Sequence, residues 1–204
     1  MKRTRLLLYL ASQSSRRQAI LASMGIPFTV VPSYYRERWS RKRSPQELSV
    51  RHALGKVRKS VLPAAARFVL GGDTIVWHDG HGLGKPKHRA EALRTLRRLA
   101  GKRHSVVTGL VLWDRKTGRM LTGCSETDVW MKAFQESALR EYIQKIHPYD
   151  KAGAYAIQGR PKIVRKIRGS YSNVVGLPRE LLRKMLNQIL KKTDEGYTDG
   201  VGRR

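Results

Sequence analysis

Apolar positions along the chain follow two patterns. Short runs that are mostly apolar indicate strands, and apolar residues spaced three or four apart indicate helices with one buried face. The predicted strands cover residues 6–11, 27–31, 68–77, 105–113 and 120–131. The predicted helices cover residues 15–24, 45–62, 90–100, 139–146 and 179–192. Residues 151–178, which are rich in glycine and polar side chains, are predicted to form a loop.

The first strand leads through a serine-rich turn into the first helix. Ser15 and Gln18 have the spacing of a capping box, so the helix is predicted to begin at Ser15. Arg16 and Arg17 fall in its first turn, where the helix dipole disfavours each positive charge by about 0.3–1 kcal/mol. This placement suits a turn that binds an anion such as phosphate. Two solvated arginines on an ordinary capped helix are the alternative.

The second helix has the cap, the first-turn proline and the reciprocal glutamate of a typical helix start at residues 44–47. Lys56 lies on the flank of its apolar face, where periodicity favours a surface lysine. The preceding loop, residues 34–43, reads YYRERWSRKR, and Glu37 is its only acid. Such a loop is usually solvated. The functional alternative is that Glu37 holds a metal ion or a water molecule.

The strand at residues 68–77 contains a carboxylate, Asp73, within the sequence FVLGGDTIVW. A carboxylate in a buried strand is costly unless it is paired, hydrogen-bonded or bound to a metal. The two glycines before it allow a close backbone approach or a bulge. Asp73 is therefore the strongest catalytic candidate, and a structural turn is the alternative.

A second glycine-rich turn contains Gly84 and Lys85, which invites comparison with a phosphate-binding P-loop. Pro86 stands where that motif needs a serine or threonine, and the upstream glycine has the wrong spacing, so the motif is rejected. Lys85 could still reach a phosphate as a point charge.

Three further polar side chains have two interpretations each. His78 and His81 could form a metal pair, although two histidines at a hairpin turn are more often solvated. Gln158, before a glycine, could read the edge of a nucleobase, although capping a turn is the more common role.

The length of 204 residues is sufficient for one domain with its own core. We expect a single domain over residues 1–192, because residues 193–204 have almost nothing to bury and are predicted to form a disordered tail.

Lysine and arginine together number 42 against 15 acidic residues, which gives a net charge of +27. Such a surface attracts nucleic acid, anionic membranes and polyanionic small molecules alike. The single cysteine, Cys124, excludes an intrachain disulfide and a cysteine metal cluster, and it fits a reducing compartment.

No apolar run approaches the length of a membrane span, and the one after Arg5 is too short for a signal peptide. The N-terminus is rich in arginine and has no acid before Glu37, as in an organelle presequence. However, Leu6 onward is needed for the first strand. We therefore expect a cytoplasmic protein without a membrane partner.

Six motifs together resemble the Maf family, the septum-formation-inhibitor-like nucleoside triphosphate pyrophosphatases. The resemblance extends from about Leu6 to Leu190. The motifs are LASQSSRR at 10–17, PSYYRE at 32–37, GGDT at 71–74, LGKP at 83–86, KAGAYAIQG at 151–159 and GSYSNVVGLP at 169–178.

The resemblance implies a mixed, twisted β-sheet with flanking helices and a central substrate cleft, an ITPase-like α/β fold. It also implies hydrolysis between the α and β phosphates of a nucleoside triphosphate, with Mg²⁺ or Mn²⁺ as cofactor. Asp73 matches the proton acceptor. The positions that match the metal and phosphate site are Glu37, Lys56 and Lys85, with Asp73 as a second metal ligand. Ser12, Arg16 and Arg17 match the phosphate turn.

Three positions assign the chain to the pyrimidine branch of that family, which acts on dTTP and UTP. They are Arg16, Thr74 and Gln158, where the 7-methylguanine branch has Trp, Gln and Glu. Two features depart from the family pattern: Ser15 replaces a proline, and the loop around Glu37 is basic where it is normally acidic.

The resemblance further implies a nucleoside triphosphate substrate, a house-cleaning role in the nucleotide pool and a possible homodimer. The competing hypothesis is a basic nucleic-acid-binding protein on the same scaffold with little or no activity, and its motivation is the charge of +27. Basic residues are dispersed along the helices without an RNA-reading motif, which favours a generally cationic surface with non-specific attraction to nucleic acid.

Overall fold

The computed structural model describes residues 6–40, 42–158 and 161–195. Its centre is a seven-stranded sheet in the order β2-β1-β3-β5-β6-β7, with β4 also paired to β3. The strands are β1 (Leu8–Leu10), β2 (Phe28–Val30), β3 (Phe68–His78), β4 (His81–Leu83), β5 (Arg103–Asp114), β6 (Met120–Met131) and β7 (Val164–Arg168). β1 runs parallel to both β2 and β3, and the pairs from β3 through β7 are antiparallel. The predicted mixed α/β fold is confirmed.

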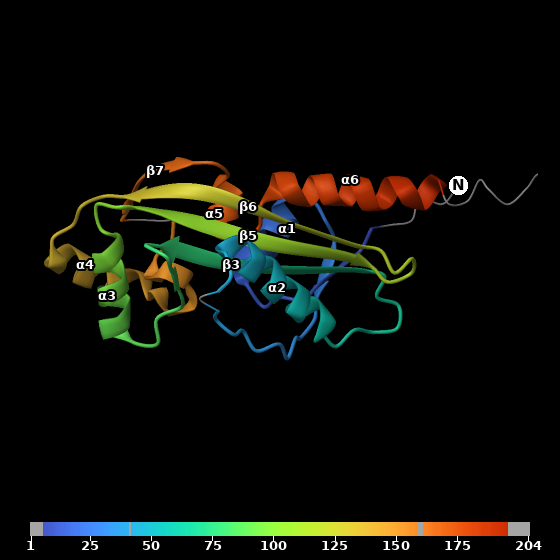
Figure 1. The fold of residues 1–204 in the computed structure, drawn as a ribbon, viewed down its shortest axis with the longest axis horizontal. Helices are drawn as coiled ribbons and strands as arrows, with labels where there is room; N and C mark the ends of the chain where they lie inside the picture. Colours follow the sequence, from blue (N-terminus) through green and yellow to red (C-terminus); the bar gives the residue numbers. More distant parts are fainter. Residues whose placement is uncertain (1–5, 41, 159–160, 196–204) are drawn as a thin grey trace, which may run out of the picture.

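The helices flank this sheet (Figure 1). They are α1 (Ser15–Ser23), α2 (Pro45–Arg58), α3 (Arg89–Leu99), α4 (Glu136–Ile146), α5 (Tyr171–Val175) and α6 (Arg179–Glu195), with 3-10 turns η1 (Pro148–Asp150) and η2 (Ala152–Ala154). None of the helices in the described ranges is long and apolar enough to cross a membrane.

Three local predictions differ from the structure. The cap of α1 is Ser14, whose hydroxyl accepts a hydrogen bond from the Arg17 amide, so the predicted Ser15–Gln18 capping box is wrong. The predicted loop 151–178 contains β7 and α5, because β7 gains its hydrogen bonds from β6 and not from a local pattern. α6 continues to Glu195, past the predicted end at 192. The rest of the predicted tail, 196–204, lies outside the described residues.

The two faces of the sheet have separate cores. On one face, α1 and α6 pack through Leu21, Leu182 and Leu186 against leucines of β1, β3 and β5. On the other face, Ala53 and Val57 of α2 pack on valines of β3 and β5. A third cluster joins α3 and α4 to one end of the sheet, at the left of Figure 1.

Two glycines let α2 lie unusually close to the sheet. A Cβ at Gly109 would come within 2.4 Å of backbone atoms of α2, and a Cβ at Gly71 within 2.6 Å of the Ala53 carbonyl oxygen. Larger residues at these positions would push the helix outward. This close approach brings Lys56, on the last turns of α2, over Asp73 on β3.

Candidate active site

A cleft of about 510 Å³ opens between the turn before α1, the loop after β2, strand β3 and the segment around η1 and η2. The structure brings all the candidate residues into the lining of this one cleft. They are Ser12, Arg16, Arg17, Glu37, Lys56, Asp73, Thr74, Lys85 and Gln158.

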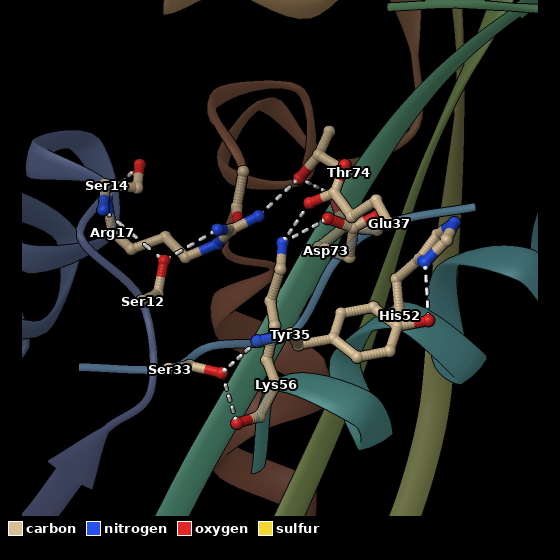
Figure 2. A network of polar contacts seen from close by, with 12 residues as sticks. Ser12, Ser14, Arg17, Ser33, Tyr35, Glu37, His52, Lys56, Asp73 and Thr74 are labelled. Atoms are coloured by element: carbon tan, nitrogen blue, oxygen red, sulfur yellow. Dashed lines mark hydrogen bonds and ion pairs between the residues drawn. The ribbon is translucent and has the colours of Figure 1, made fainter. Parts of the chain in front are cut away.

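The centre of the cleft is an amine between two carboxylates (Figure 2). Nζ of Lys56 lies 2.5 Å from Oδ1 of Asp73 and 2.7 Å from Oε1 of Glu37. Asp73 is buried, with 6% of its surface exposed, whereas Glu37 comes from an exposed loop. Lys56 therefore joins a strand carboxylate to a loop carboxylate.

The pKa values of the two carboxylates are shifted in opposite directions, upward for Asp73 and downward for Glu37. Burial raises the pKa of Asp73, the neighbouring Glu37 charge adds to that rise, and Lys56 opposes it. Burial also acts to raise the pKa of Glu37, but the Lys56 ion pair outweighs it and holds the pKa below its ordinary value. A raised carboxylate pKa makes Asp73 the better proton acceptor, and a lowered one keeps Glu37 ionised as a ligand for a cation.

Arg17 is buried, at 7% exposed, and is used as a tie between chain segments. Its Nη1 donates to Ser12 Oγ at 2.8 Å and its Nη2 to Thr74 Oγ1 at 3.0 Å. Its Nε donates to the carbonyl oxygen of Gly176 at 2.8 Å. Burial lowers the pKa of Arg17, although an arginine stays charged near neutral pH. The guanidinium thus holds the serine turn, β3 and the end of α5 together.

Arg16, in contrast, lies at the rim of the cleft. Its Nη1 donates to Oδ2 of Asp150 at 2.6 Å and its Nη2 to the Asp150 carbonyl oxygen at 3.1 Å. Asp150 also contacts Lys151. The two arginines thus have different surroundings: Arg17 is buried and hydrogen-bonded to three chain segments, and Arg16 is half-buried and paired with Asp150. Phosphate binding by the two stays a prediction.

Lys85 and Gln158 are exposed at the same rim. Lys85 follows β4, and Gln158 ends the segment after η2. Among the described residues neither side chain has an ion pair like those that hold Lys56.

Several residues of the site escaped sequence analysis. The Thr108 hydroxyl donates to the Asn173 carbonyl oxygen at 3.1 Å and therefore accepts from the Thr74 hydroxyl at 3.0 Å. The register of β3 and β5 places the two threonines opposite each other, which no local spacing reveals. Asp150 and His52 were also missed; the signal for His52 was its position one turn before Lys56 on α2.

The cleft fits a divalent cation held partly by substrate. Within the described ranges no group of three His, Cys, Asp or Glu side chains is arranged to hold a metal. Glu37 and Asp73, however, converge on one positive charge. Mg²⁺ is commonly held by one or two carboxylates together with substrate phosphates and water, and this donor set suits that mode.

The two histidines near the β3–β4 turn belong to the scaffold. His78 is buried, with Nδ1 3.0 Å from the Arg103 carbonyl oxygen and Nε2 3.1 Å from Asp79, so the expectation of a solvated side chain is wrong for it. The strand pairing of β3 with β5 buries this position. His81 is exposed, as expected.

Comparison with known proteins identifies the family of the chain. The chain matches the family model described as "Maf-like protein" over residues 7–189. It is 45% identical over 170 residues to the dTTP/UTP pyrophosphatase of Geobacter sp. (strain M21), which covers 83% of this chain and 88% of that protein. It is 38% identical over 182 residues to the dTTP/UTP pyrophosphatase of Dictyoglomus thermophilum, covering 88% and 94%.

A relative from Methanosarcina mazei, also named dTTP/UTP pyrophosphatase, is 35% identical over 192 residues, which is 93% of this chain and 98% of that protein. The chain belongs to the Maf-like protein family. The resemblance carried by the six motifs is confirmed.

Proposed function

We propose that this protein hydrolyses dTTP and UTP to the monophosphate and pyrophosphate and so removes these, or modified pyrimidine nucleotides, from the nucleotide pool. The observation that carries the proposal is the Lys56 amine held between Asp73 and Glu37 in a cleft rimmed by cations. The names of the relatives support the choice of dTTP and UTP.

Asp73 is proposed as the proton acceptor for the attacking water. Its buried carboxylate has a raised pKa, which is suited to accepting a proton from water near neutral pH. Lys56 donates to Oδ1 of Asp73 and in this proposal orients that carboxylate toward the water. In this role Lys56 is a further catalytic residue, since it stays beside the reacting phosphate.

A divalent cation, Mg²⁺ or Mn²⁺, would be held by Glu37 and Asp73, and when bound it would neutralise phosphate oxygens and acidify water. The lowered pKa of Glu37 suits that role because the carboxylate stays ionised. The basic residues beside Glu37 add to the attraction for a triphosphate.

The phosphates are proposed to bind along the cationic rim. Lys85, which is exposed, and Arg16, which is half-buried, both line the cleft. Arg16 must exchange Asp150 for a phosphate oxygen, a replacement of one anion by another. Ser12 and Arg17 shape the turn that faces the phosphates.

The base is proposed to be recognised by Gln158, whose amide offers both a donor and an acceptor to thymine or uracil. Thr74 is proposed to contribute through its hydroxyl, which accepts a hydrogen bond from Nη2 of Arg17 in the lining of the cleft.

The remaining expectations are proposals of the same kind. They are a single domain over 1–192, action in the cytoplasm, a possible homodimer and weak attraction to nucleic acid through the charge of +27. Nucleic-acid binding in place of turnover finds no support in the relatives, which are named as enzymes.

The test is pyrophosphate release from dTTP, UTP, CTP, 7-methyl-GTP and dATP with Mg²⁺ or Mn²⁺. We expect turnover of dTTP and UTP above the others, and a loss of that preference in Gln158→Ala. Preference for 7-methyl-GTP would overturn the specificity, and no turnover of any nucleotide would overturn the reaction.

A further inference from the structure

Glu37 is held accurately although it comes from an exposed loop. Its carboxylate lies 2.7 Å from the Lys56 amine, yet residues 34–40 form no helix or strand. We name this stretch the Glu37 loop. An aromatic residue stands two positions before Glu37 and another two positions after it, Tyr35 and Trp39. Each ring packs directly against the backbone of a glycine, Tyr35 against Gly55 and Trp39 against Gly82.

Tyr35 packs against α2 at Gly55. A Cβ on Gly55 would lie 2.1 Å from Cε2 of Tyr35, so only a glycine leaves room for the ring. The Tyr35 hydroxyl lies 3.1 Å from Nδ1 of His52, and the two rings are 5.7 Å apart. The Tyr35 amide also donates to the Ser33 hydroxyl, which in turn donates to the Lys56 carbonyl oxygen at 2.8 Å.

One face of α2 therefore both contacts the Glu37 loop and carries the Lys56 amine. His52, Gly55 and Lys56 are spaced i, i+3 and i+4, which places them on the same side of the helix. Figure 2 shows the Tyr35 ring between the side chains of Lys56 and His52. The element that presents the Lys56 amine thus also fixes the start of the Glu37 loop.

Trp39 packs against β4 at Gly82. A Cβ on Gly82 would lie 1.9 Å from Cζ3 of Trp39, so the indole ring lies directly on this backbone. The Trp39 ring also meets the His52 ring edge-on, with centroids 6.5 Å apart. Trp39 is 51% exposed, and its inner face is used for this contact.

We propose that Tyr35, Trp39 and His52 form an aromatic clamp whose role is to position Glu37. The inference deepens the proposed function, because it rests on Glu37 binding the cation. All three side chains line the cleft. Their described contacts are with one another and with Gly55 and Gly82, so we assign them as positioning residues that act through Glu37. The clamp fixes a loop in which Arg36 and Arg38, on either side of Glu37, would otherwise repel each other.

The test disrupts the contact between the Trp39 ring and Gly82 by changing either residue. Trp39→Ala deletes the ring, and Gly82→Ala inserts a methyl group where the ring lies. Trp39→Phe keeps an aromatic ring on the glycine. Tyr34→Ala is the matched control, because Tyr34 is an aromatic residue of the same loop that is 77% exposed. The readouts are hydrogen–deuterium exchange of the Glu37 loop and the Mg²⁺ concentration for half-maximal dTTP turnover.

We expect Trp39→Ala and Gly82→Ala each to speed amide exchange of the Glu37 loop about tenfold. We also expect each to raise the half-saturating Mg²⁺ concentration about tenfold and to lower kcat by a similar factor, because a displaced ligand weakens both. The double variant is expected to be no worse than Trp39→Ala, since both changes remove one contact. Trp39→Phe should retain most of the wild-type behaviour, and Tyr34→Ala should match the wild type.

Unchanged exchange in Trp39→Ala would overturn the proposal. A fall in kcat with an unchanged Mg²⁺ requirement would also overturn it, because the ring would then act on the nucleotide and not through Glu37. If the wild-type protein turns over neither dTTP nor UTP, the proposed function fails, while the exchange comparison still decides whether the clamp holds the loop.

Discussion

The Lys56 amine and the Asp73 carboxylate are 2.5 Å apart because a helix is packed close enough to a strand for a side chain of one to reach the other. The same amine reaches Glu37 of the loop. Periodicity alone made Lys56 a surface lysine, and the contact between α2 and β3 places it between the two carboxylates instead. The ion pair therefore couples the protonation of both carboxylates to one residue.

Lys56→Met tests that coupling. Lys56 lowers the pKa of both carboxylates, so its removal should raise both and move the acidic limb of the pH profile of kcat/KM to higher pH. Turnover at neutral pH should fall about 100-fold, since a cation beside the reacting phosphate is also lost. Lys59→Met, on an exposed residue at the end of α2, should leave the profile unchanged. An unshifted acidic limb in Lys56→Met would contradict the assignment.

Asp73→Asn should change the dependence of folding on pH in a defined direction. Burial raises the folded-state pKa of Asp73, so its ionisation destabilises the fold as pH rises above the unfolded pKa. Relative to wild type, Asp73→Asn should therefore be more stable near pH 7 than near pH 4, which means a more positive difference in the free energy of unfolding. Urea denaturation at the two pH values measures this.

For Asp128→Asn, the stability difference from wild type should change with pH in the opposite direction. Burial acts to raise the pKa of Asp128, but hydrogen bonds from Arg103 and Arg168 lower it, so this carboxylate stabilises the fold above its unfolded pKa. That stabilisation is lost as pH falls through the lowered folded pKa. Asp128→Asn should thus cost more near pH 7 than near pH 3. If the stability differences of the two variants changed with pH in the same direction, the assigned pKa shifts of Asp73 and Asp128 would be contradicted.

Arg16 and Arg17 should separate binding from stability. Arg17→Ala removes three hydrogen bonds, to Ser12, Thr74 and the Gly176 carbonyl oxygen, and should cost about 3 kcal/mol of unfolding free energy. Arg16→Ala should leave the unfolding free energy nearly unchanged and raise KM for dTTP about tenfold, because the half-buried guanidinium is proposed to bind the phosphates. Chemical denaturation and steady-state kinetics on both variants decide this, and a stable Arg17→Ala would show that the tie is dispensable.

Salt should slow the enzyme through substrate capture. The net charge of +27 and the exposed Arg36 and Arg38 beside Glu37 attract a triphosphate over a Debye length of about 10 Å at 0.1 M salt. We expect kcat/KM for dTTP to fall steeply with KCl while kcat changes little. The double variant Arg36→Gln/Arg38→Gln should flatten the dependence, and an equally steep one in that variant would refute local steering.

The parts of the fold that follow from local pattern were predictable. The β3 and β6 strands and the start of α2 at Pro45 agree with the sequence, because apolar runs and capping residues act over a few positions. β7 and α5 were missed because their stability comes from β6 and from buried partners of Asn173. These contacts lie far apart in the chain and leave no periodic signal.

The candidate site shows the same division. A carboxylate in a buried strand identified Asp73 from local chemistry alone. For Glu37 and Gln158 a functional role was only the less common interpretation of the local sequence, and for Lys56 periodicity favoured a surface lysine, until the family resemblance was considered. The structure adds relationships that neither the local sequence nor the family resemblance indicated. It separates a buried Arg17 from a half-buried Arg16, and it reveals the partner residues Thr108 and Asp150.

The most direct test of the account is parallel measurement of pyrophosphate and orthophosphate release from dTTP by the wild type, Asp73→Asn and Asp79→Asn. Asp79 is an exposed turn residue outside the cleft, and an asparagine tolerates its positive φ. We predict that the wild type and Asp79→Asn release pyrophosphate without orthophosphate, and that Asp73→Asn loses at least about 100-fold in rate while remaining folded. Wild-type turnover by Asp73→Asn, or release of orthophosphate by the wild type, would contradict the central claim.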